Sequence, residues 1–490
     1  MGYLLGIDFG GGASKATLLC ENGDVVAVHV VEYPTRHPKK GWSEQNPEDW
    51  ISAIKENIRA VISLSNISVN DIKAVALDAA THVAVLLDEK YRLLRPSIYW
   101  TDVRSKKEVD FLCEKYGQII MDKTLHKPDT IWTLPQLLWI RKNEPEIWKQ
   151  CKYILFAKDY VRYRMTGNIG TDRIEAQGSM FFDINSGKWS EELCDIVSLK
   201  ENMLPKLYEP LDIVGEITAN VALETGLARG TLVICGTTDT AMEILAAGAV
   251  SKKDVTIKLA TAGRICVITG RAYPNTQLIN YSHIINGLWY PGTATKSAAA
   301  SYRWYRDNFG GDYKSLDIEA SSIKPCCNGL MFHPYLTGEL TPYGDPLLCG
   351  SFTGIRAEHT KAHFNRAVLE GVAFSLLDCK HELKRAGIIH KNEAIIIGGG
   401  ASSKLWKQIV ADVLEMKLYQ YEISDSSFGA AMLAGVAIGV FKDFKSALNS
   451  CIKLADVTKP NAENTAKYLE KYKDYCRIHD ALAPIYHSMR

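Results

Sequence analysis

The chain has 490 residues, of which 47% are hydrophobic and 23% charged, and its formal net charge is +1. Because a domain usually spans about 100–200 residues, this length predicts two or three domains. No run of lysine and arginine is long enough to form a nucleic-acid or membrane patch, which excludes an extended polyanion as a partner.

The cysteines and the first residues indicate a cytoplasmic protein. The 12 cysteines are scattered and show neither a CxxC pair nor metal-ligand spacing, which is typical of a reducing compartment. The sequence opens directly on a predicted strand, so we expect no signal peptide. The apolar run 429–441 is shorter than the about 20 residues that span a bilayer, and we expect it to form a buried helix.

The first hundred residues predict a mixed sheet with helices packed on it. YLLGID, KATLLC and VVAVHVV read as three strands joined by tight turns. A helix is expected to begin after Asn46, a good N-cap, with Pro47 in its first turn and apolar residues on one face. The strand AVALD follows, and this order of hairpins, helix and strand favours an α/β fold.

A similar hairpin, DVTIKLATAGRICVITG, returns about 250 residues downstream. It again leads to strand and helix alternation, ending in EAIIIGGGASSKLWKQIVADVL. The repeat predicts two related domains facing each other, with their boundary where Ser251 to Asp254 interrupt two apolar runs. We therefore expect domains at 1–250 and 251–442, followed by a helical tail at 443–490.

The turn after the first strand combines three glycines with a carboxylate. Gly10, Gly11 and Gly12 permit positive φ and close approach, so their N–H groups could converge on phosphate oxygens; an ordinary tight turn is the alternative. Asp8 would repel a phosphate chain unless Mg²⁺ and its waters lie between the two anions. Lys15, on the return strand, could neutralise further charge or simply be solvated.

Three further turns are candidates for function. The second hairpin turn offers the hydroxyl of Thr261 and small neighbours, so two such turns could hold one triphosphate. Asp239 follows an apolar strand directly before a helix, where α/β proteins place functional side chains, although Thr238 or Asp239 could simply cap that helix. Gly398–Gly400 could face a base or ribose, or serve close strand–helix packing; neither GxGxxG nor GxxxxGK[ST] is matched.

In this order the motifs resemble the FGGY family of carbohydrate kinases, most closely its xylulose-kinase branch. The most specific match is GSFTGI (350–355) followed after seven residues by HFNRAVLE (363–370), which fits the C-terminal signature of the family. GWSEQNPEDW, LRPSIYWTDVRS and GLMFHPYLTGELTPYGDP support it, and the resemblance covers nearly the whole chain. It implies two ribonuclease-H-like domains, as in actin, hexokinase and chaperone ATPases, with an interdomain cleft.

The resemblance also implies a reaction and its residues. A small sugar and ATP would be the partners, with Mg²⁺ as cofactor, no nucleic acid or membrane, and a homodimer as the assembly to test. Asp239 would be the general base that accepts the proton of a sugar hydroxyl. The other implied residues are Thr81, His82, Asp102 and Arg104 for the sugar, Gly10, Gly11, Gly12, Lys15, Thr261, Gly399, Gly400 and Ser403 for ATP, and Asp8 for Mg²⁺ through water.

Departures from the family pattern leave the substrate open. Ala80-Thr81 replaces the usual Gln-Met before His82, Ala260-Thr261-Ala262 replaces Gly-Thr-Ser, and Gln136 stands where the N-terminal signature has Lys. Thr237, Thr238 and Thr240 flank Asp239 in place of the usual Gly, Gly and Asn. A ketopentose such as D-xylulose is the first expectation, with ribulose, a polyol or an aldonate as alternatives. From another class, a nucleotide-dependent switch or a sugar-responsive regulator would use the same scaffold.

Overall fold

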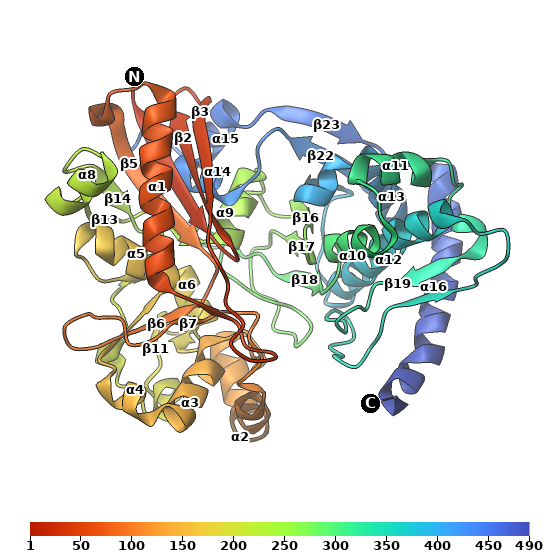
Figure 1. Cartoon of the computed structure of the whole chain (residues 1–490), viewed down its shortest axis with the longest axis horizontal. Coiled ribbons are helices and arrows are strands. Elements are labelled where there is room, and N and C mark those ends of the chain that lie inside the picture. The colour runs from red at the N-terminus through yellow and green to blue at the C-terminus, as the bar shows by residue number, and fades with distance from the viewer. Residues whose placement is uncertain (490) are drawn as a thin grey trace. The chain divides into compact units, whose positions relative to one another are not determined.

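The computed structural model describes residues 1–489, which divide into two compact units (Figure 1). Unit 1 comprises residues 1–248, 281–286 and 423–452, and unit 2 comprises 249–280, 287–422 and 453–490. The first division lies close to the expected boundary at 250. The expected boundary at 442 differs, because the chain returns to unit 1 for 423–452 before it ends in unit 2.

Unit 1 is built on a mixed seven-stranded sheet of order β13-β14-β5-β1-β2-β3, with β15 also paired to β5. The three N-terminal strands form the predicted antiparallel meander, and β5 runs parallel to β1. The strands are β1 (Tyr3–Phe9), β2 (Ala13–Cys20), β3 (Val25–Glu32), β5 (Ile72–Ala79), β13 (Ile213–Glu216), β14 (Leu232–Ile234) and β15 (Thr237–Thr238).

Helices cover both faces of this sheet. Helix α1 (Pro47–Ser65) begins as predicted, because the side chain of Asn46 accepts from the N–H of Glu48 at 3.2 Å, and it packs on β2 and β3. On the other face, α14 (Ser426–Ala437) packs on β1, where a Cβ on Gly6 would lie 1.9 Å from the carbonyl oxygen of Ser427. Gly6 is therefore the residue that lets α14 reach the sheet. The buried helix expected at 429–441 is confirmed as α14 for residues 429–437, whereas 438–441 follow the end of this helix.

The remaining elements of unit 1 surround the ends of the sheet. Its other helices are α2 (Lys106–Thr124), α3 (Thr133–Asn143), α4 (Pro145–Gln150), α5 (Ala157–Thr166), α6 (Arg173–Gly178), α7 (Glu191–Ile196), α8 (Ala219–Thr225), α9 (Asp239–Ala246) and α15 (Phe444–Cys451). Its short strands are β4 (Glu44–Gln45), β6 (Ala84–Leu87), β7 (Ser97–Ile98), β8 (Tyr153–Phe156), β9 (Thr171–Asp172), β10 (Phe182–Asp183), β11 (Lys188–Trp189) and β12 (Leu207–Tyr208).

Unit 2 repeats the architecture with a six-stranded sheet of order β18-β17-β16-β21-β22-β23. Its strands are β16 (Val255–Leu259), β17 (Gly263–Val267), β18 (Gly292–Thr295), β21 (Glu393–Ile397), β22 (Lys417–Tyr421) and β23 (Leu454–Thr458), with β19 (Met331–His333) and β20 (Ser351–Thr353) forming a separate pair. The expected helical tail is wrong at 454–458, because this segment pairs antiparallel with β22 as β23.

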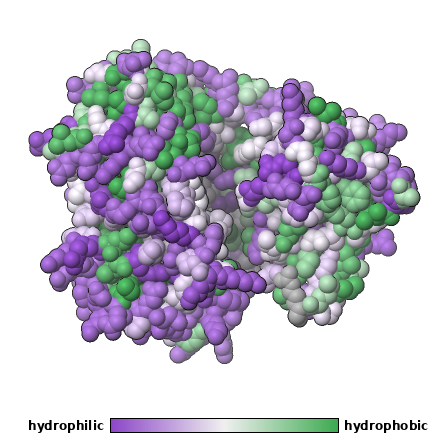
Figure 2. All heavy atoms as spheres, in the orientation of Figure 1, coloured by the Kyte–Doolittle hydropathy of each residue, from purple (hydrophilic) through white to green (hydrophobic). Residues whose placement is uncertain are grey.

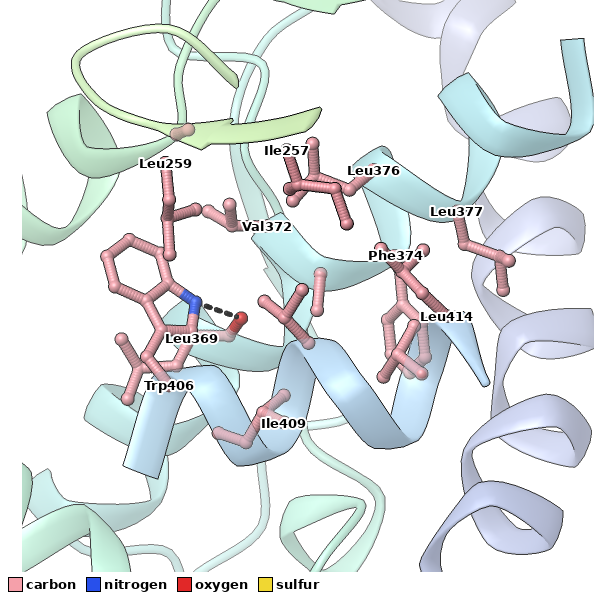
Figure 3. Close-up of a cluster of buried hydrophobic side chains, with 14 of the residues drawn as sticks. Ile257, Leu259, Leu369, Val372, Phe374, Leu376, Leu377, Trp406, Ile409 and Leu414 are labelled. Atoms are coloured by element: carbon pink, nitrogen blue, oxygen red, sulfur yellow. Dashed lines mark hydrogen bonds between the residues drawn. The ribbon is translucent and has the colours of Figure 1, made fainter. Parts of the chain in front are cut away.

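The core of unit 2 lies between its sheet and two central helices, α12 (Lys361–Arg385) and α13 (Lys404–Leu414) (Figure 3). The indole of Trp406 is fully buried and donates to the carbonyl oxygen of Leu369 at 3.0 Å, which joins the two helices. Leu259 and Val372 pack beside it. The outer helices are α10 (Ala299–Phe309), α11 (Tyr313–Ser321) and α16 (Ala462–Ser488).

Two surface features complete the description. Figure 2 shows hydrophobic side chains gathered at the upper left of the view. On the edge strand β3, Val26, Val28 and Val30 are 38–50% exposed. Within residues 1–489, no helix is both long enough and apolar enough to cross a membrane.

Candidate active site

Three acidic side chains lie near or directly after the ends of three neighbouring strands of unit 1. Asp8, near the end of β1, lies in register with Asp78 of β5, and Asp78 lies in register with Thr237 of β15. Asp239 follows β15 as the first residue of α9. The topology therefore gathers three carboxylates at one edge of the sheet, although they are far apart in the sequence.

Gly236 fixes the strand that leads to Asp239. Its φ is +71°, a left-handed conformation, and a Cβ here would lie 1.9 Å from the carbonyl oxygen of Leu77. Only glycine satisfies both conditions. The backbone before Asp239 is thus pressed directly against β5.

Asp239 does not cap helix α9, which was the alternative to a functional role for this residue. Thr238 is the N-cap of α9, and its hydroxyl accepts from the N–H of Ala241 at 3.3 Å. Asp239 is half-buried, and its Oδ1 accepts from the N–H of Thr240 at 2.6 Å and lies 3.5 Å from the hydroxyl of Thr81. One carboxylate edge is held by the protein at the start of a helix, where the dipole favours negative charge.

Asp78 is a functional candidate that sequence reasoning missed. Its side chain is completely buried, and within residues 1–489 no N–H or O–H group donates to either carboxylate oxygen. Burial raises its pKa well above the ordinary value, and the charge of Asp8 raises it further. Burial likewise raises the pKa of Asp8 to about 7, with Asp239 and Glu243 adding to the effect. The two carboxyls share a hydrogen bond when one of them carries a proton.

The glycine turn differs from its expected conformation. None of Gly10, Gly11 and Gly12 has a positive φ, so the turn does not use the left-handed backbone that glycine permits. Side chains instead hold the turn by its carbonyls: the hydroxyl of Tyr33 donates to Gly10 at 2.7 Å and that of Thr35 to Gly11 at 2.6 Å.

The outer side of this turn is open. A Cβ on Gly10 would meet nothing within 4 Å, and in the described part of the chain the N–H groups of Gly11 and Gly12 donate to no other group. Two unsatisfied donors and free space suit an anion.

Lys15 is already paired. Its ammonium group lies 2.8 Å from Asp425, the N-cap of α14, and both side chains are 31% exposed. Thr17 and Ser427 make a second link between β2 and α14, with 2.7 Å between their hydroxyl oxygens. Lys15 thus joins segments that are distant in sequence, and a phosphate would have to compete with Asp425 for it.

Thr81 and His82 lie beside a cluster of aromatic rings. The His82 ring centroid is 4.9 Å from that of Trp132, and Trp132 stacks on His126 at 4.5 Å. Burial, reinforced by the charge of His126, lowers the pKa of His82 to about 3, so the imidazole is neutral. A Cβ on Gly178 would lie 2.8 Å from the His82 ring and 3.0 Å from the Thr81 methyl, so the site is closely packed on that side.

Asp102 and Arg104 are bound to each other and to neighbouring groups. Arg104 forms an ion pair of 2.7 Å with Asp102, reaches Glu44 at 2.7 Å, and lies 3.6 Å from the ring centroid of Trp42. Asp102 also accepts from the N–H of Ser43 at 2.6 Å. Both side chains are 1% exposed. These contacts hold both side chains in place within the protein, and the expected role of Asp102 and Arg104 in sugar binding stays a prediction.

A buried charged cluster supports the strand before Asp239. Asp172 accepts from the hydroxyl of Thr237 at 2.7 Å and lies 3.2 Å from the ammonium group of Lys158. Lys158 also pairs with Asp159 at 2.5 Å, and all three charged side chains are fully buried. A buried ion pair adds little net stability, because the desolvation of both charges offsets most of their attraction.

In unit 2, the second hairpin turn lies at the start of a helix. The carbonyl oxygens of Ala260 and Thr261 accept from the N–H groups of Ala299 and Ala298, at 2.7 and 3.0 Å. The turn therefore satisfies the first donors of α10, which has no side-chain cap. Thr261 itself is exposed.

The glycines after β21 have separate roles. Gly398 has φ +91° and its Cβ would lie 2.8 Å from the carbonyl oxygen of Leu259, whereas a Cβ on Gly399 would meet nothing within 4 Å. Gly400 packs on the Leu259 side chain, where a Cβ would come within 2.7 Å. The hydroxyl of Ser403 caps α13 by accepting from the N–H of Trp406 at 3.0 Å. Only Gly399 of these residues presents an open face.

The acidic group in unit 1 fits a hydrated magnesium ion. Within residues 1–489, no group of three or more His, Cys, Asp or Glu side chains is arranged to hold a metal by itself. Mg²⁺ usually binds one or two carboxylates together with waters and phosphate oxygens, so it needs no such group. The donor-free oxygens of Asp78 and the partly exposed Asp8 are suitable acceptors for those waters.

Comparison with known proteins decides the family. Sequence models of the FGGY carbohydrate kinases match this chain at residues 3–246 for the N-terminal domain and 231–438 for the C-terminal domain. The chain belongs to the FGGY family of carbohydrate kinases. A xylulose kinase of Bacillus subtilis is 33% identical over 98% of this chain and 97% of its own length. One from Escherichia coli is 31% identical over 98% and 99%.

Solved structures agree with this assignment. The ligand-bound xylulose kinase of Lactobacillus acidophilus superposes with a TM-score of 0.93 at 25% identity, covering both chains completely. The expected two-domain fold of the actin and hexokinase type is therefore confirmed. As an FGGY kinase, the protein is a phosphotransferase that uses ATP with Mg²⁺ and a sugar as acceptor.

Proposed function

We propose that this FGGY kinase phosphorylates a ketopentose, with D-xylulose as the first candidate, and that Asp239 is the general base. The names of its full-length relatives support the substrate class. The observation that carries the role of Asp239 is its position: it is half-buried at the start of α9, it does not cap that helix, and Thr81 is 3.5 Å away.

In this proposal the residues of unit 1 perform the transfer. ATP with Mg²⁺ supplies the γ-phosphoryl group. Thr81 and the neutral His82 hydrogen-bond sugar hydroxyls, and Asp239 accepts the proton of the hydroxyl that attacks. Asp8 and Asp78 hold the waters of the metal, while the open N–H groups of the Gly10–Gly12 turn bind phosphate oxygens. Phosphoryl transfer depends mainly on such positioning and charge neutralisation.

In unit 2 we assign the open face at Gly399 to the nucleoside and the exposed Thr261 to phosphate. Gly400 and Ser403 then act indirectly, by packing on Leu259 and by capping α13. We further propose a cytoplasmic location, in keeping with 12 free cysteines. A homodimer remains an expectation that light scattering would test.

The decisive experiment is coupled ADP release with Mg²⁺ and ATP against D- and L-xylulose, D- and L-ribulose, erythritol, glycerol and gluconate. We expect one ketopentose to dominate and Asp239→Asn to lower kcat about 10²–10⁴-fold, the usual contribution of a general base. Asp49→Asn is the matched control, because Asp49 also lies in the first turn of a helix but pairs with Arg36.

Other outcomes would separate the alternatives. A dominant response to gluconate or a polyol would keep the kinase and change its substrate. Sugar binding without any sugar-dependent ADP release would favour a regulator. Loss of nucleotide binding together with turnover in Asp239→Asn would show that Asp239 is structural.

A further inference from the structure

His82 has a strained backbone that side chains hold at both ends. Its φ is +56°, a left-handed conformation that residues other than glycine rarely adopt. Its N–H donates to Oε1 of Glu175 at 2.5 Å, and its carbonyl oxygen accepts from the hydroxyl of Thr133 at 2.7 Å. Strain of this kind persists only where the surroundings enforce it, and it concentrates at functional sites.

The ring of His82 is prepared for a ligand. The side chain is 7% exposed, and a hydrogen bond to the backbone of Ile131 involves the ring. Its Nδ1 is buried and, among residues 1–489, has no hydrogen-bond partner. A buried nitrogen without a partner costs free energy unless a bound molecule satisfies it. A sugar hydroxyl is the donor that would do so.

Glu175 lies behind His82, out of reach of a substrate. It is 1% exposed, in the first turn of α6, and Asp172 caps this helix by accepting from the N–H groups of Ile174 and Glu175 at 2.9 and 3.2 Å. Burial raises the pKa of Glu175 well above its ordinary value, and the charge of Asp159 raises it further. A protonated carboxyl still accepts from a backbone N–H through its carbonyl oxygen.

We propose that Glu175 is a positioning residue, which holds the backbone of His82 in the left-handed conformation and so directs the imidazole to the sugar. The proposal rests on the proposed role of His82 in sugar binding. Its new content is that substrate affinity depends on a fully buried carboxyl that never touches the substrate. The hydrogen bond to the His82 N–H carries this effect, and the charge of Glu175 does not.

Two isosteric variants separate the hydrogen bond from the rest of the side chain. In Glu175→Gln the amide oxygen accepts the same N–H, whereas Glu175→Met fills similar volume with no strong acceptor. We expect Met to raise KM for the sugar about tenfold or more, since a buried N–H loses its partner. KM for ATP should stay within about twofold, and Gln should keep the sugar KM within about threefold of wild type.

The control is Glu48→Gln, because Glu48 accepts from the hydroxyl of Tyr160 at 2.7 Å within the same unit but on α1. It should leave both KM values unchanged. Equal loss of sugar affinity in the Gln and Met variants of Glu175, or no loss in either, would overturn the proposal.

Crystal structures of the two Glu175 variants give a readout that does not depend on activity. We expect residue 82 to keep φ near +56° in Glu175→Gln and to leave the left-handed region in Glu175→Met. An unchanged His82 backbone in the Met variant would overturn the inference even if the kinase is active. Absence of turnover with every sugar, together with a displaced His82 in the Met variant, would contradict only the proposed function.

Discussion

The two sheets have the same strand order and the same strand directions, but their central strands carry different side chains near their ends. In unit 1, β13-β14-β5-β1-β2-β3 corresponds to β23-β22-β21-β16-β17-β18 of unit 2, with matching parallel and antiparallel pairs throughout. Asp8 pairs with Asp78 in the first sheet. At the corresponding place in the second, Lys258 pairs with Ile397.

This difference shows that two units with the same fold can have different functions. Both units have a short turn between their first two strands. Both also have a glycine with positive φ whose backbone lies against a central strand: Gly236 lies against Leu77 of β5 in unit 1, and Gly398 against Leu259 of β16 in unit 2. At the matching strand ends, unit 1 has the carboxylates Asp8 and Asp78, whereas unit 2 has Lys258 and Ile397. We therefore expect damage in unit 1 to affect turnover and damage in unit 2 to affect nucleotide affinity.

The largest effect should follow Gly236→Ala in unit 1. The added Cβ would meet the carbonyl oxygen of Leu77 at 1.9 Å, so β15 must move and carry Asp239 with it. Displacement of a reacting group by about 1 Å can cost about 10²-fold in rate, and we expect at least this loss in kcat. Gly117→Ala in α2, where a Cβ has room, is the control. Turnover within threefold of wild type would contradict the assigned role of this strand.

In unit 2, Gly399→Leu should raise KM for ATP about tenfold, because the new side chain enters the open face assigned to the nucleoside. The KM for the sugar and the thermal unfolding midpoint should remain unchanged, since a Cβ there meets no protein atom within 4 Å. Steady-state kinetics with each substrate varied would check this. A change in the KM for the sugar alone would contradict the assignment of nucleotide binding to unit 2.

A smaller effect concerns stability and pH without Mg²⁺. The pKa of Asp8 is raised from 3.8 to about 7 in the folded protein, so folded chains bind a proton that unfolded chains release. The stabilising contribution of that proton is complete below pH 3.8 and is lost as pH rises through about 7.

The free energy of unfolding of wild type relative to Asp8→Asn should therefore fall by at least about 1 kcal/mol over this window. Urea unfolding at several pH values would measure it. A rise with pH would show that Asp8 is stabilised as a carboxylate instead.

The smallest expected effect is that the protonation state of His82 does not change over the physiological pH range. Because the pKa of His82 is lowered to about 3, its imidazole stays neutral from pH 8 down to 5.5. The KM for the sugar should therefore show no ionisation attributable to His82 in that range. A step in KM near pH 6.5 that disappears in His82→Gln would contradict the buried, neutral state.

Much of this architecture could be predicted from the sequence. The hairpins, the Asn46-capped helix and the repeat of the fold follow from local patterns of alternation, capping and glycine turns. The family signature was also readable, but its residues serve the core: Arg366 pairs with Glu370 at 2.8 Å and donates to the hydroxyl of Tyr468 at 2.8 Å. A signature can therefore identify a protein without marking its chemistry.

What could not be predicted depends on pairing between distant segments. Asp78 reads as the end of an ordinary strand, and only its register with Asp8 reveals a buried acidic pair. Glu175 carries no local signal either, because its partner is a backbone N–H 93 residues away. Conversely, the Gly10–Gly12 triplet suggested left-handed backbone that the turn does not use, since side-chain hydroxyls hold it by its carbonyls.

The position of helix α14 in the sequence determines when unit 1 can complete its fold during synthesis. It covers β1, the first strand of this chain, yet its residues lie more than 400 positions later. At about 5–20 residues per second, the apolar face of β1 waits tens of seconds for its cover. A nascent chain that stops before Ser426 already carries Asp8, Asp78 and Asp239 on a complete sheet that still lacks its α14 cover, so unit 1 is finished only after most of this chain has been made.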